Sequence, residues 1–271
     1  MSFEYIETSK HAGVGTLTFN RPRVLNAFNN ELMDETSAAM TAFAADDEVL
    51  AVIVCGAGRA FSAGFDLKAS GERSLDSVDK VRDQMEKQFH FIMQFWDCPK
   101  PTIAAVHGYC LAGAFELSLA CDITVAAQGT FFGEPEVRFG TGIIAMLLPW
   151  ITGPKQAKEL LLTGDDRLSA DDALRIGVIN KIVEAGALMD SANRFAERIV
   201  RASTVSVAYT KAGINRSYEA MGLKSALATG LDLDIMLNAT PSPEKTEFAR
   251  IRKEQGVKAA LAWRDARFSD D

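Results

Sequence analysis

The sequence has no hydrophobic run long enough to cross a membrane and no segment typical of an export signal. No apolar stretch approaches the roughly 20 residues that a membrane-spanning helix requires. The amino terminus, MSFEYIETSK, has no basic segment followed by an apolar one, so it does not resemble a secretory signal. We therefore expect a soluble, cytoplasmic protein that does not bind membranes.

Residues suited to metal, disulfide or nucleic-acid chemistry are also scarce. The four cysteines show no CxxC spacing, and His11, His90 and His107 are widely separated. We therefore expect reduced, buried thiols and no metal site. The formal net charge of −7 argues against the basic surface of a nucleic-acid-binding protein. An anionic ligand would need a local basic patch.

Common nucleotide and hydrolase motifs are incomplete. The stretch CGAGRAF follows a predicted strand, but Phe61 occupies the third glycine position of a dinucleotide loop, and no GK[ST] occurs. Ser62 lies in AFSAG, where Ala60 replaces the first glycine of a nucleophile elbow. No histidine follows His107, so the usual Ser, Asp, His order cannot be completed. Ser62 is expected to be a loop hydroxyl.

The pattern of the 271 residues, of which 48% are hydrophobic, predicts an α/β core followed by helices. The runs VLAVIVCG, TIAAVHG and DITVAA are short and continuously apolar, which is typical of buried strands. Helical spacing separates them, as in NNELMDETSAAMTAFAADD. After about residue 202 every segment has a helical pattern. The expected organisation is a core over residues 1–200 and a helical region over residues 201–271.

The segment HGYCLAGAFELSLACD, residues 107–122, predicts a helix of small and apolar side chains with Glu116 in its middle. Burying an ionised carboxylate costs several kcal/mol or more unless a partner offsets it. Either a basic residue pairs with Glu116, or the protein requires an acid in a dry place.

Two glycine segments and a second acid suggest what that place is. Gly64 in SAGFDL and Gly113 in LAGAFEL precede predicted helix starts, where free N–H groups bind anions. Two converging donors would form an oxyanion hole. Glu134 and Glu136 flank a proline that is expected to keep their segment out of helix, in a loop or at an edge. Glu116 and Glu136 then form a candidate general acid/base pair, the alternative being a turn glycine and a surface acid.

In order and spacing, four segments resemble the crotonase superfamily, and within it the enoyl-CoA hydratases. The segments are FNRPRVLNAF, AFSAGFDLK, HGYCLAGAFELSLACD and FGEPEVRFG. The tail KTEFARIRKEQGVKAALAWRDARF is similar to the closing helix of that family. The resemblance implies a spiral of ββα turns with a helical carboxy-terminal region that drives assembly into a homotrimer or homohexamer. It also implies acyl-CoA substrates, with no metal and with coenzyme A present only as part of the substrate.

The resemblance also assigns roles to individual residues. Glu116 would orient and deprotonate the water that attacks the β-carbon, and Glu136 would deliver a proton to the α-carbon. The backbone N–H groups of Phe65 and Gly113 would form the oxyanion hole. The implied substrate-binding positions are Arg23, Ala63, Phe65, Asp66, Leu67, Lys68, Gly113 and Ile144, with Arg23 and Lys68 at the coenzyme A phosphates.

One segment departs from the family pattern. The hydratases usually carry a Pro- and Gly-rich stretch after the second glutamate, whereas this chain has GTGIIAMLLPW, with Ile143, Ile144 and Met146 where small residues are expected. The segment borders the acyl pocket in the family, so the sequence does not predict which acyl chain the pocket accepts. The predicted activity is hydration of a 2-enoyl-CoA. One alternative is a double-bond isomerase, which shuttles a proton through one glutamate, or another crotonase-type acyl-CoA reaction. An alternative of another class is a non-catalytic acyl-CoA-binding oligomer.

Overall fold

Consecutive strands of the chain are divided between two β-sheets. The structure, a computed structural model, describes residues 3–72 and 77–268. The six-stranded sheet has the order β1-β2-β3-β4-β6-β9, and the three-stranded sheet has the order β5-β7-β8. The strands are β1 (Ile6–His11), β2 (Val14–Phe19), β3 (Ala51–Gly56), β4 (Thr102–Val106), β5 (Tyr109–Leu111), β6 (Ile123–Ala127), β7 (Phe131–Gly133), β8 (Leu168–Ser169) and β9 (Lys181–Val183). Strands β4 and β6 of the first sheet are each followed by a strand of the second sheet, β5 or β7, and then by a helical segment. The chain therefore makes the predicted ββα turns.

The central strands of the larger sheet are parallel and covered on both faces. All residues of β4 are buried, as are the first five of β3, in line with the continuous apolar runs that predicted them. The first two strands instead form an antiparallel hairpin. Its turn consists of Ala12 and Gly13, which both have positive φ.

Helices enclose these sheets. They are α1 (Asn30–Ala45), α2 (Leu67–Glu72), α3 (Val78–Asp97), α4 (Gly113–Ala120), α5 (Leu148–Ile151), α6 (Pro154–Thr163), α7 (Ala170–Arg175), α8 (Leu188–Val200), α9 (Thr204–Ala220), α10 (Leu223–Ala239), α11 (Pro243–Gln255) and α12 (Val257–Ala266), with 3-10 helices η1 (Pro22–Val24), η2 (Pro135–Phe139) and η3 (Ala185–Ala187). The helical spacing expected for this segment is confirmed by α1, whose buried residues run along one face from Leu32 to Phe43. Among the described residues, no helix is both long and apolar enough to cross a membrane.

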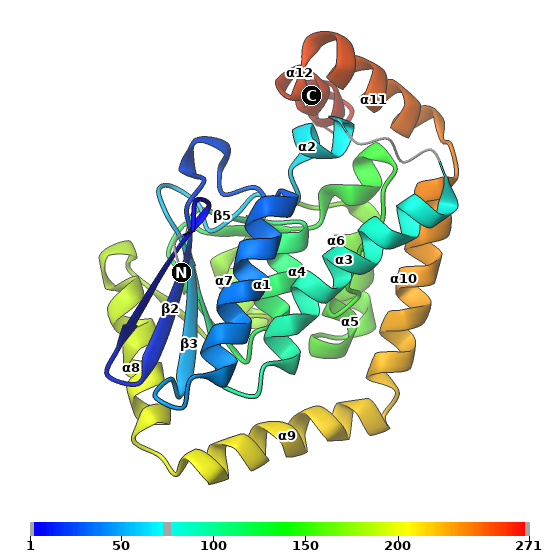
Figure 1. The fold of residues 1–271 in the computed structure, drawn as a ribbon. Helices are drawn as coiled ribbons and strands as arrows, with labels where there is room; N and C mark the ends of the chain where they lie inside the picture. The colour runs from blue at the N-terminus through cyan, green and yellow to red at the C-terminus, as the bar shows by residue number, and fades with distance from the viewer. Residues whose placement is uncertain (1–2, 73–76, 269–271) are drawn as a thin grey trace.

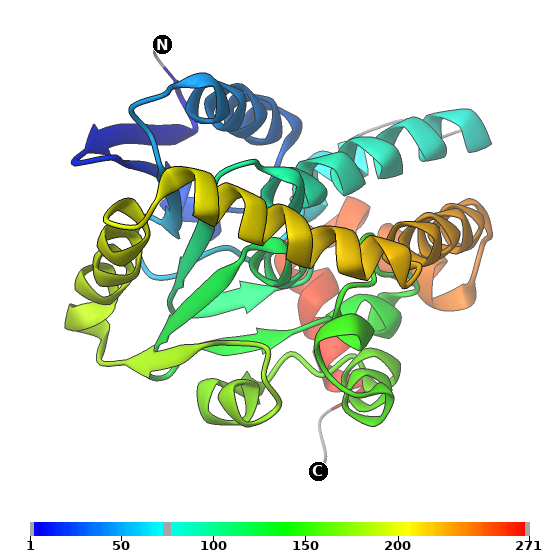
Figure 2. The same cartoon turned by 90° about the horizontal axis from the view of Figure 1, so that it is seen from below.

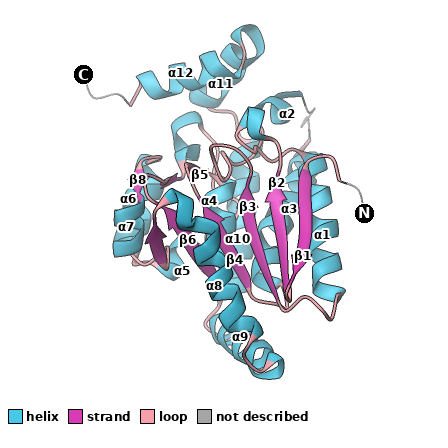
Figure 3. Ribbon diagram, turned by 90° about the vertical axis from the view of Figure 1, so that its left-hand side faces the viewer, coloured by secondary structure: helices cyan, strands magenta, loops and turns pink. Residues whose placement is uncertain are grey.

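The helical tail wraps around the core. Figures 1 and 2 show α9 passing along one side of the sheet, α10 running back along the next side, and α11 and α12 lying over the end that carries α2. Figure 3 shows the same end from another side, with α11, α12 and α2 together at the top of the molecule. Leu223, Leu227 and Ile235 of α10 pack into the main hydrophobic core, whereas Phe248 of α11 joins a smaller cluster with Phe139 of η2. A boundary at residue 200 stays a prediction.

Two local predictions were wrong. Residues 107–122 do not form one helix, because residues 109–111 are strand β5 and α4 begins only at Gly113. Ala112, with φ 57° and ψ −138°, separates the two elements. The segment around Glu134 is not an irregular loop, because Pro135 opens the 3-10 helix η2. Proline is accepted at the first position of a helix, where its missing N–H costs no hydrogen bond.

Candidate active site

Two loops leave neighbouring parallel strands at the same edge of the sheet. Strand β3 pairs in parallel with β4, and the chain after β3 leads to Gly64, while the chain after β4 leads to Gly113. Ser62 forms a bridge to Cys110, so the first loop runs beside β5 as an extra strand. A Cβ atom built on Gly64 would lie 2.7 Å from the carbonyl oxygen of Leu111 and 3.2 Å from the nitrogen of Gly113. The two predicted donor segments are therefore in direct contact.

Phe65 is held so that its own N–H stays available. Phe28 donates to the carbonyl of Gly64, and Asp66 donates to the carbonyl of Phe28. The intervening N–H of Phe65 has no acceptor in the described part of the chain. Gly113 is the first residue of α4, so its N–H has no acceptor within the helix either. The structure thus places the two predicted oxyanion-hole donors side by side.

Backbone strain at Ala112 sets the direction of the second donor. Ala112 has a positive φ of 57°, which costs a non-glycine residue on the order of 1–3 kcal/mol. Its N–H donates to the carbonyl of Gly133, which fixes this conformation from the neighbouring strand. Strain of this kind, held by surrounding contacts, is typical of functional sites.

Within residues 3–72 and 77–268, Glu116 has no basic partner; two backbone amides hold it instead. It lies in the first turn of α4 and is 1% exposed. Its Oε1 accepts from the N–H of Ile144 at 3.2 Å, and its Oε2 accepts from the N–H of Ala145 at 2.6 Å. These bonds favour the ionised form, but burial and the neighbouring Glu136 outweigh them and raise the pKa of Glu116 well above its ordinary value. The pKa of Glu116 is therefore set by burial and by a neighbouring acid, and not by a basic partner.

Glu136 lies beside Glu116, on η2, and is 7% exposed. Burial raises the pKa of Glu136 to about 7. Its Oε2 has no hydrogen-bond partner in the described part of the chain. A carboxyl group with this pKa and a free oxygen can give up or accept a proton near neutral pH. The structure therefore brings the two predicted acids together.

Two further buried acids were not predicted as site residues. Glu134 is 1% exposed, and burial followed by the charge of Glu136 raises its pKa well above the ordinary value. The interaction between these two side chains lowers the pKa of Glu136 and raises that of Glu134. Asp234 reaches the same region from α10 and is 4% exposed. Glu134 was visible in the sequence as the neighbour of Pro135, whereas only tertiary contacts reveal Asp234.

The predicted basic positions lie on the surface near α2. Arg23 and Lys68 are exposed, on η1 and α2. The side chain of Asp66 already makes two contacts within the protein. It accepts a hydrogen bond from the backbone N–H of Lys68 and forms a 2.9 Å ion pair with Arg21. That pair joins the loop carrying Arg23 to the start of α2. Arg252 of α11, which sequence patterns did not single out, donates to the carbonyl of Leu67 at 3.2 Å.

The remaining predicted positions have backbone roles or line the site. The N–H of Ala63 donates to the carbonyl of Leu25, so any contact to a ligand must come from its other atoms. Leu67 is half-buried against the small α11–α12 cluster. Ile144 is buried and contacts Glu116 through its backbone. Ser62 is the expected structural hydroxyl, since it donates to the carbonyl of Asn26 and is fully buried.

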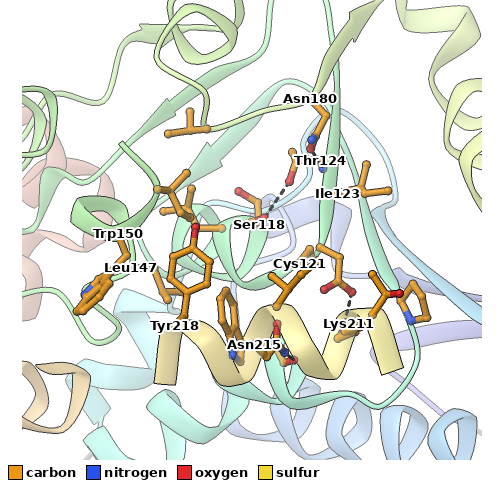
Figure 4. Close-up of a pocket in the computed structure, with 18 of the residues that line it drawn as sticks. Ser118, Cys121, Ile123, Thr124, Leu147, Trp150, Asn180, Lys211, Asn215 and Tyr218 are labelled. Atoms are coloured by element: carbon orange, nitrogen blue, oxygen red, sulfur yellow. Dashed lines mark hydrogen bonds and ion pairs between the residues drawn. The ribbon is translucent and has the colours of Figure 1, made fainter. Parts of the chain in front are cut away.

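A cavity of about 520 Å³ lies away from these acids, between α9 and the core (Figure 4). It is lined by Ser118 and Leu119 from the far end of α4 and not by Glu116. Its main charged groups already satisfy each other, because Lys211 forms a 2.7 Å ion pair with Asp122. The lining thus offers no spare acid or base, in contrast to the region around Glu116 and Glu136. No group of three or more potential metal ligands occurs within the described ranges.

Comparison with known proteins gives consistent results. The profile of the family described as Enoyl-CoA hydratase/isomerase matches residues 9–269. The chain is 34% identical to the mitochondrial enoyl-CoA hydratase of Pongo abelii, over 99% of this chain and 89% of that protein. It is 32% identical to the crotonyl-CoA hydratase of Syntrophomonas wolfei, over 99% of both. A crystal structure of an enoyl-CoA hydratase/isomerase from Xanthobacter autotrophicus Py2 superimposes with a TM-score of 0.97 at 48% identity, covering 99% of this chain and 100% of that one.

Proposed function

The chain belongs to the enoyl-CoA hydratase/isomerase family within the crotonase superfamily, and from this premise we propose how it acts as an enoyl-CoA hydratase. It adds water across the 2,3 double bond of a 2-enoyl-CoA thioester, using an oxyanion hole and two glutamates. The observation that carries the proposal is the buried pair of Glu116 and Glu136 behind two backbone donors. An acyl-CoA-binding protein without catalysis would have no use for two uncompensated buried acids.

The thioester carbonyl receives both backbone donors. The N–H groups of Phe65 and Gly113 bind its oxygen and stabilise the negative charge that develops when water attacks the β-carbon. One such donor contributes about 3 kcal/mol to transition-state stabilisation. Because the donors are fixed by the Phe28 bridge and by the strained Ala112, little reorganisation is required as the enolate forms.

The two glutamates carry out the two proton transfers of hydration. Glu116, anchored by Ile144 and Ala145, removes a proton from the water, and the resulting hydroxide oxygen bonds to the β-carbon. Glu136 supplies the proton that completes the α-carbon. The pair holds one proton before and after the reaction, and it is reset when that proton returns from Glu116 to Glu136. Burial raises the pKa of both groups, so a proton can be held between them near neutral pH.

Coenzyme A is bound at the surface beside α2. Exposed Arg23 and Lys68 meet its phosphates, and the ion pair between Arg21 and Asp66 keeps these two segments together. Half-buried Arg252 adds a third positive charge on the same side. This local basic group answers the overall negative charge of the protein.

We assign the tail to assembly into a homotrimer or homohexamer. Large apolar side chains of α9, of α10 and of the turn between them point outward: Val205, Tyr209, Ile214, Met221, Leu233 and Met236 are all more than half exposed. Exposed apolar surface of this extent on two adjoining helices is typical of a protein interface. The cavity under α9 (Figure 4) adjoins the same surface.

One assay tests the proposed reaction. The protein is mixed with a short and a long 2-enoyl-CoA, and absorbance of the conjugated thioester is followed. Absorbance should fall with the wild-type chain and fall roughly 10²–10⁴-fold more slowly with Glu136→Gln, while an exposed control, Glu159→Gln, should match the wild type. Conversion of a 3-enoyl-CoA by a chain that leaves 2-enoyl-CoA unchanged would replace hydration with isomerisation. Tight binding without any conversion would favour a non-catalytic acyl-CoA-binding protein.

A further inference from the structure

A buried carboxylate from the helical tail faces the active-site loop. Asp234 lies on α10 and is 4% exposed. Its Oδ1 accepts a hydrogen bond from Nδ2 of Asn238 at 2.8 Å, one helical turn further along. Its Oδ2 has no hydrogen-bond partner in the part of the chain that the structure describes. An acid so placed costs free energy, so a role beyond packing is required.

The carboxylate rests directly on Gly142. A Cβ atom built on Gly142 would lie 2.2 Å from Oδ1 of Asp234, so only glycine leaves room for the acid. Gly142 also offers its backbone N–H to the carboxylate and thereby favours its ionised form. Asp234 thus holds the loop at a position where side-chain volume is excluded.

That loop carries the two amides that anchor Glu116. Ile144 and Ala145 follow Gly142 by two and three residues, and both donate to Glu116. On the other side of Gly142, the N–H of Thr141 donates to the carbonyl of Glu136. Four of the five residues from 141 to 145 therefore contact one of the two glutamates or Asp234. The fifth, Ile143, lies between two of them.

We propose that Asp234 is a positioning residue for hydration: it fixes the loop of residues 140–146 from α10 and so holds Glu116 in its working orientation. The proposal rests on the function assigned above. It gives the tail a second task besides assembly, since the inner face of α10 orients the base while its outer face exposes Leu233 and Met236.

The charge of Asp234 has a further consequence. Asp234 raises the pKa of both Glu116 and Glu136 through repulsion. Burial raises the pKa of Asp234 itself to about 6, against the opposing influence of Gly142, Lys245 and Asn238. The charged or polar groups that face Asp234 are therefore Gly142, Lys245, Asn238 and the two glutamates. Above that pH the ionised Asp234 helps to keep a proton on Glu136, which the hydration step consumes.

Two substitutions separate the hydrogen bond from the charge. Asp234→Asn keeps an oxygen for Gly142 but removes the charge, whereas Asp234→Ala removes both. Asp232→Ala is the matched control, because Asp232 lies on the same helix with its side chain 62% exposed, paired only at the surface with Arg82. Hydration is measured as kcat, KM and the pH profile, and hydrogen exchange is measured for the amides of residues 140–146.

We expect Asp234→Ala to lower kcat on the order of 10- to 100-fold, with little change in KM and faster exchange in the loop. Asp234→Asn should retain most of kcat, and its loop amides should exchange as slowly as those of the wild type. The loss of its activity at alkaline pH should begin at a lower pH than in the wild type. Asp232→Ala should change none of these. Unchanged loop exchange together with an unmoved pH limb in both Asp234 variants overturns the proposal. If Asp234→Ala does not fold, the pH limb of Asp234→Asn decides.

Loss of the proposed function would be recognised separately. A wild-type chain that hydrates no 2-enoyl-CoA refutes hydration, but the exchange comparison between Asp234→Ala and Asp234→Asn still tests whether Asp234 holds the loop. Equal loop exchange in these two variants and the wild type would then refute the positioning role by itself.

Discussion

The Oε2 atom of Glu116 lies 2.6 Å from the backbone nitrogen of Ala145. This contact joins the proposed base to the segment in which the chain departs from the family pattern. The Oε1 atom makes the matching contact with Ile144. Because backbone and not side-chain atoms hold Glu116, the bulky side chains at residues 143 and 144 can change the acyl pocket without removing the anchor.

The two glutamates should behave as a unit. Glu116→Gln and Glu136→Gln each remove an exchangeable proton, so each should lower kcat by roughly 10²–10⁴-fold while KM changes little. The double variant should lose much less than the product of the two factors, because neither group works without the other. Steady-state kinetics on a 2-enoyl-CoA measures all three. A Glu116→Gln variant with wild-type kcat would show that Glu116 is only a structural acid.

The buried acids should also make stability depend on pH in an unusual direction. The pKa of Glu136 is raised from 4.5 to about 7, so the folded state binds this proton more tightly than the unfolded state does. Its stabilising effect is complete below about pH 4.5 and is lost as pH rises through 7, with an upper bound of about 3 kcal/mol. Denaturant unfolding between pH 5 and 8 should therefore give a steeper loss of stability in the wild type than in Glu136→Gln. Equal slopes for the two proteins would contradict the raised pKa.

How much the sequence could reveal is clearest at the glutamates. The apolar neighbours of Glu116 predicted its burial, and the glycine segments predicted two donors, because both signals are local. The boundary of α4 was missed, since its start depends on the strain at Ala112 and on a bond to Gly133 in another strand. Asp234 could not be predicted, because its burial requires Gly142, about 90 residues earlier in the chain, to lie against α10.

The proposed phosphate contacts should influence binding and not chemistry. Arg23→Ala or Lys68→Ala should raise KM roughly fivefold, which corresponds to about 1 kcal/mol for an exposed ion pair, and should leave kcat nearly unchanged. Added salt should shrink the difference from the wild type. Lys155→Ala, an exposed change on α6, is the control. Wild-type KM in both test variants would mean that the phosphates bind elsewhere.

Assembly should depend on the outer face of α10. Leu233 and Met236 are 62% and 65% exposed, and replacing both with Asp should place charges in the proposed interface and shift the protein toward monomer. Leu162→Asp is the control, since Leu162 is 73% exposed on α6. Sedimentation velocity at micromolar concentration should give a trimer or hexamer for the wild type and the control. A compact wild-type monomer would refute the assembly.

The convergence of the two backbone donors can be tested by a single methyl group. A Cβ atom on Gly113 would lie 2.3 Å from Cε2 of Phe65, so Gly113→Ala must displace the ring of the residue that carries the other donor. Losing one oxyanion-hole donor typically costs 10²–10³-fold in kcat, and we expect a loss in that range. Gly213→Ala is the control, because nothing lies within 4 Å of the added atom. Gly213 lies in α9, where alanine should stabilise the helix by up to about 1 kcal/mol.

Coenzyme A binding separates this loss from unfolding. Gly113→Ala should bind coenzyme A nearly as well as the wild type, because Arg23 and Lys68 lie on η1 and α2 and not on α4. Isothermal titration with coenzyme A and kinetics with a 2-enoyl-CoA together test the assignment. Normal kcat in Gly113→Ala would contradict a thioester oxygen between Phe65 and Gly113, since the added methyl group and the displaced ring lie at that position.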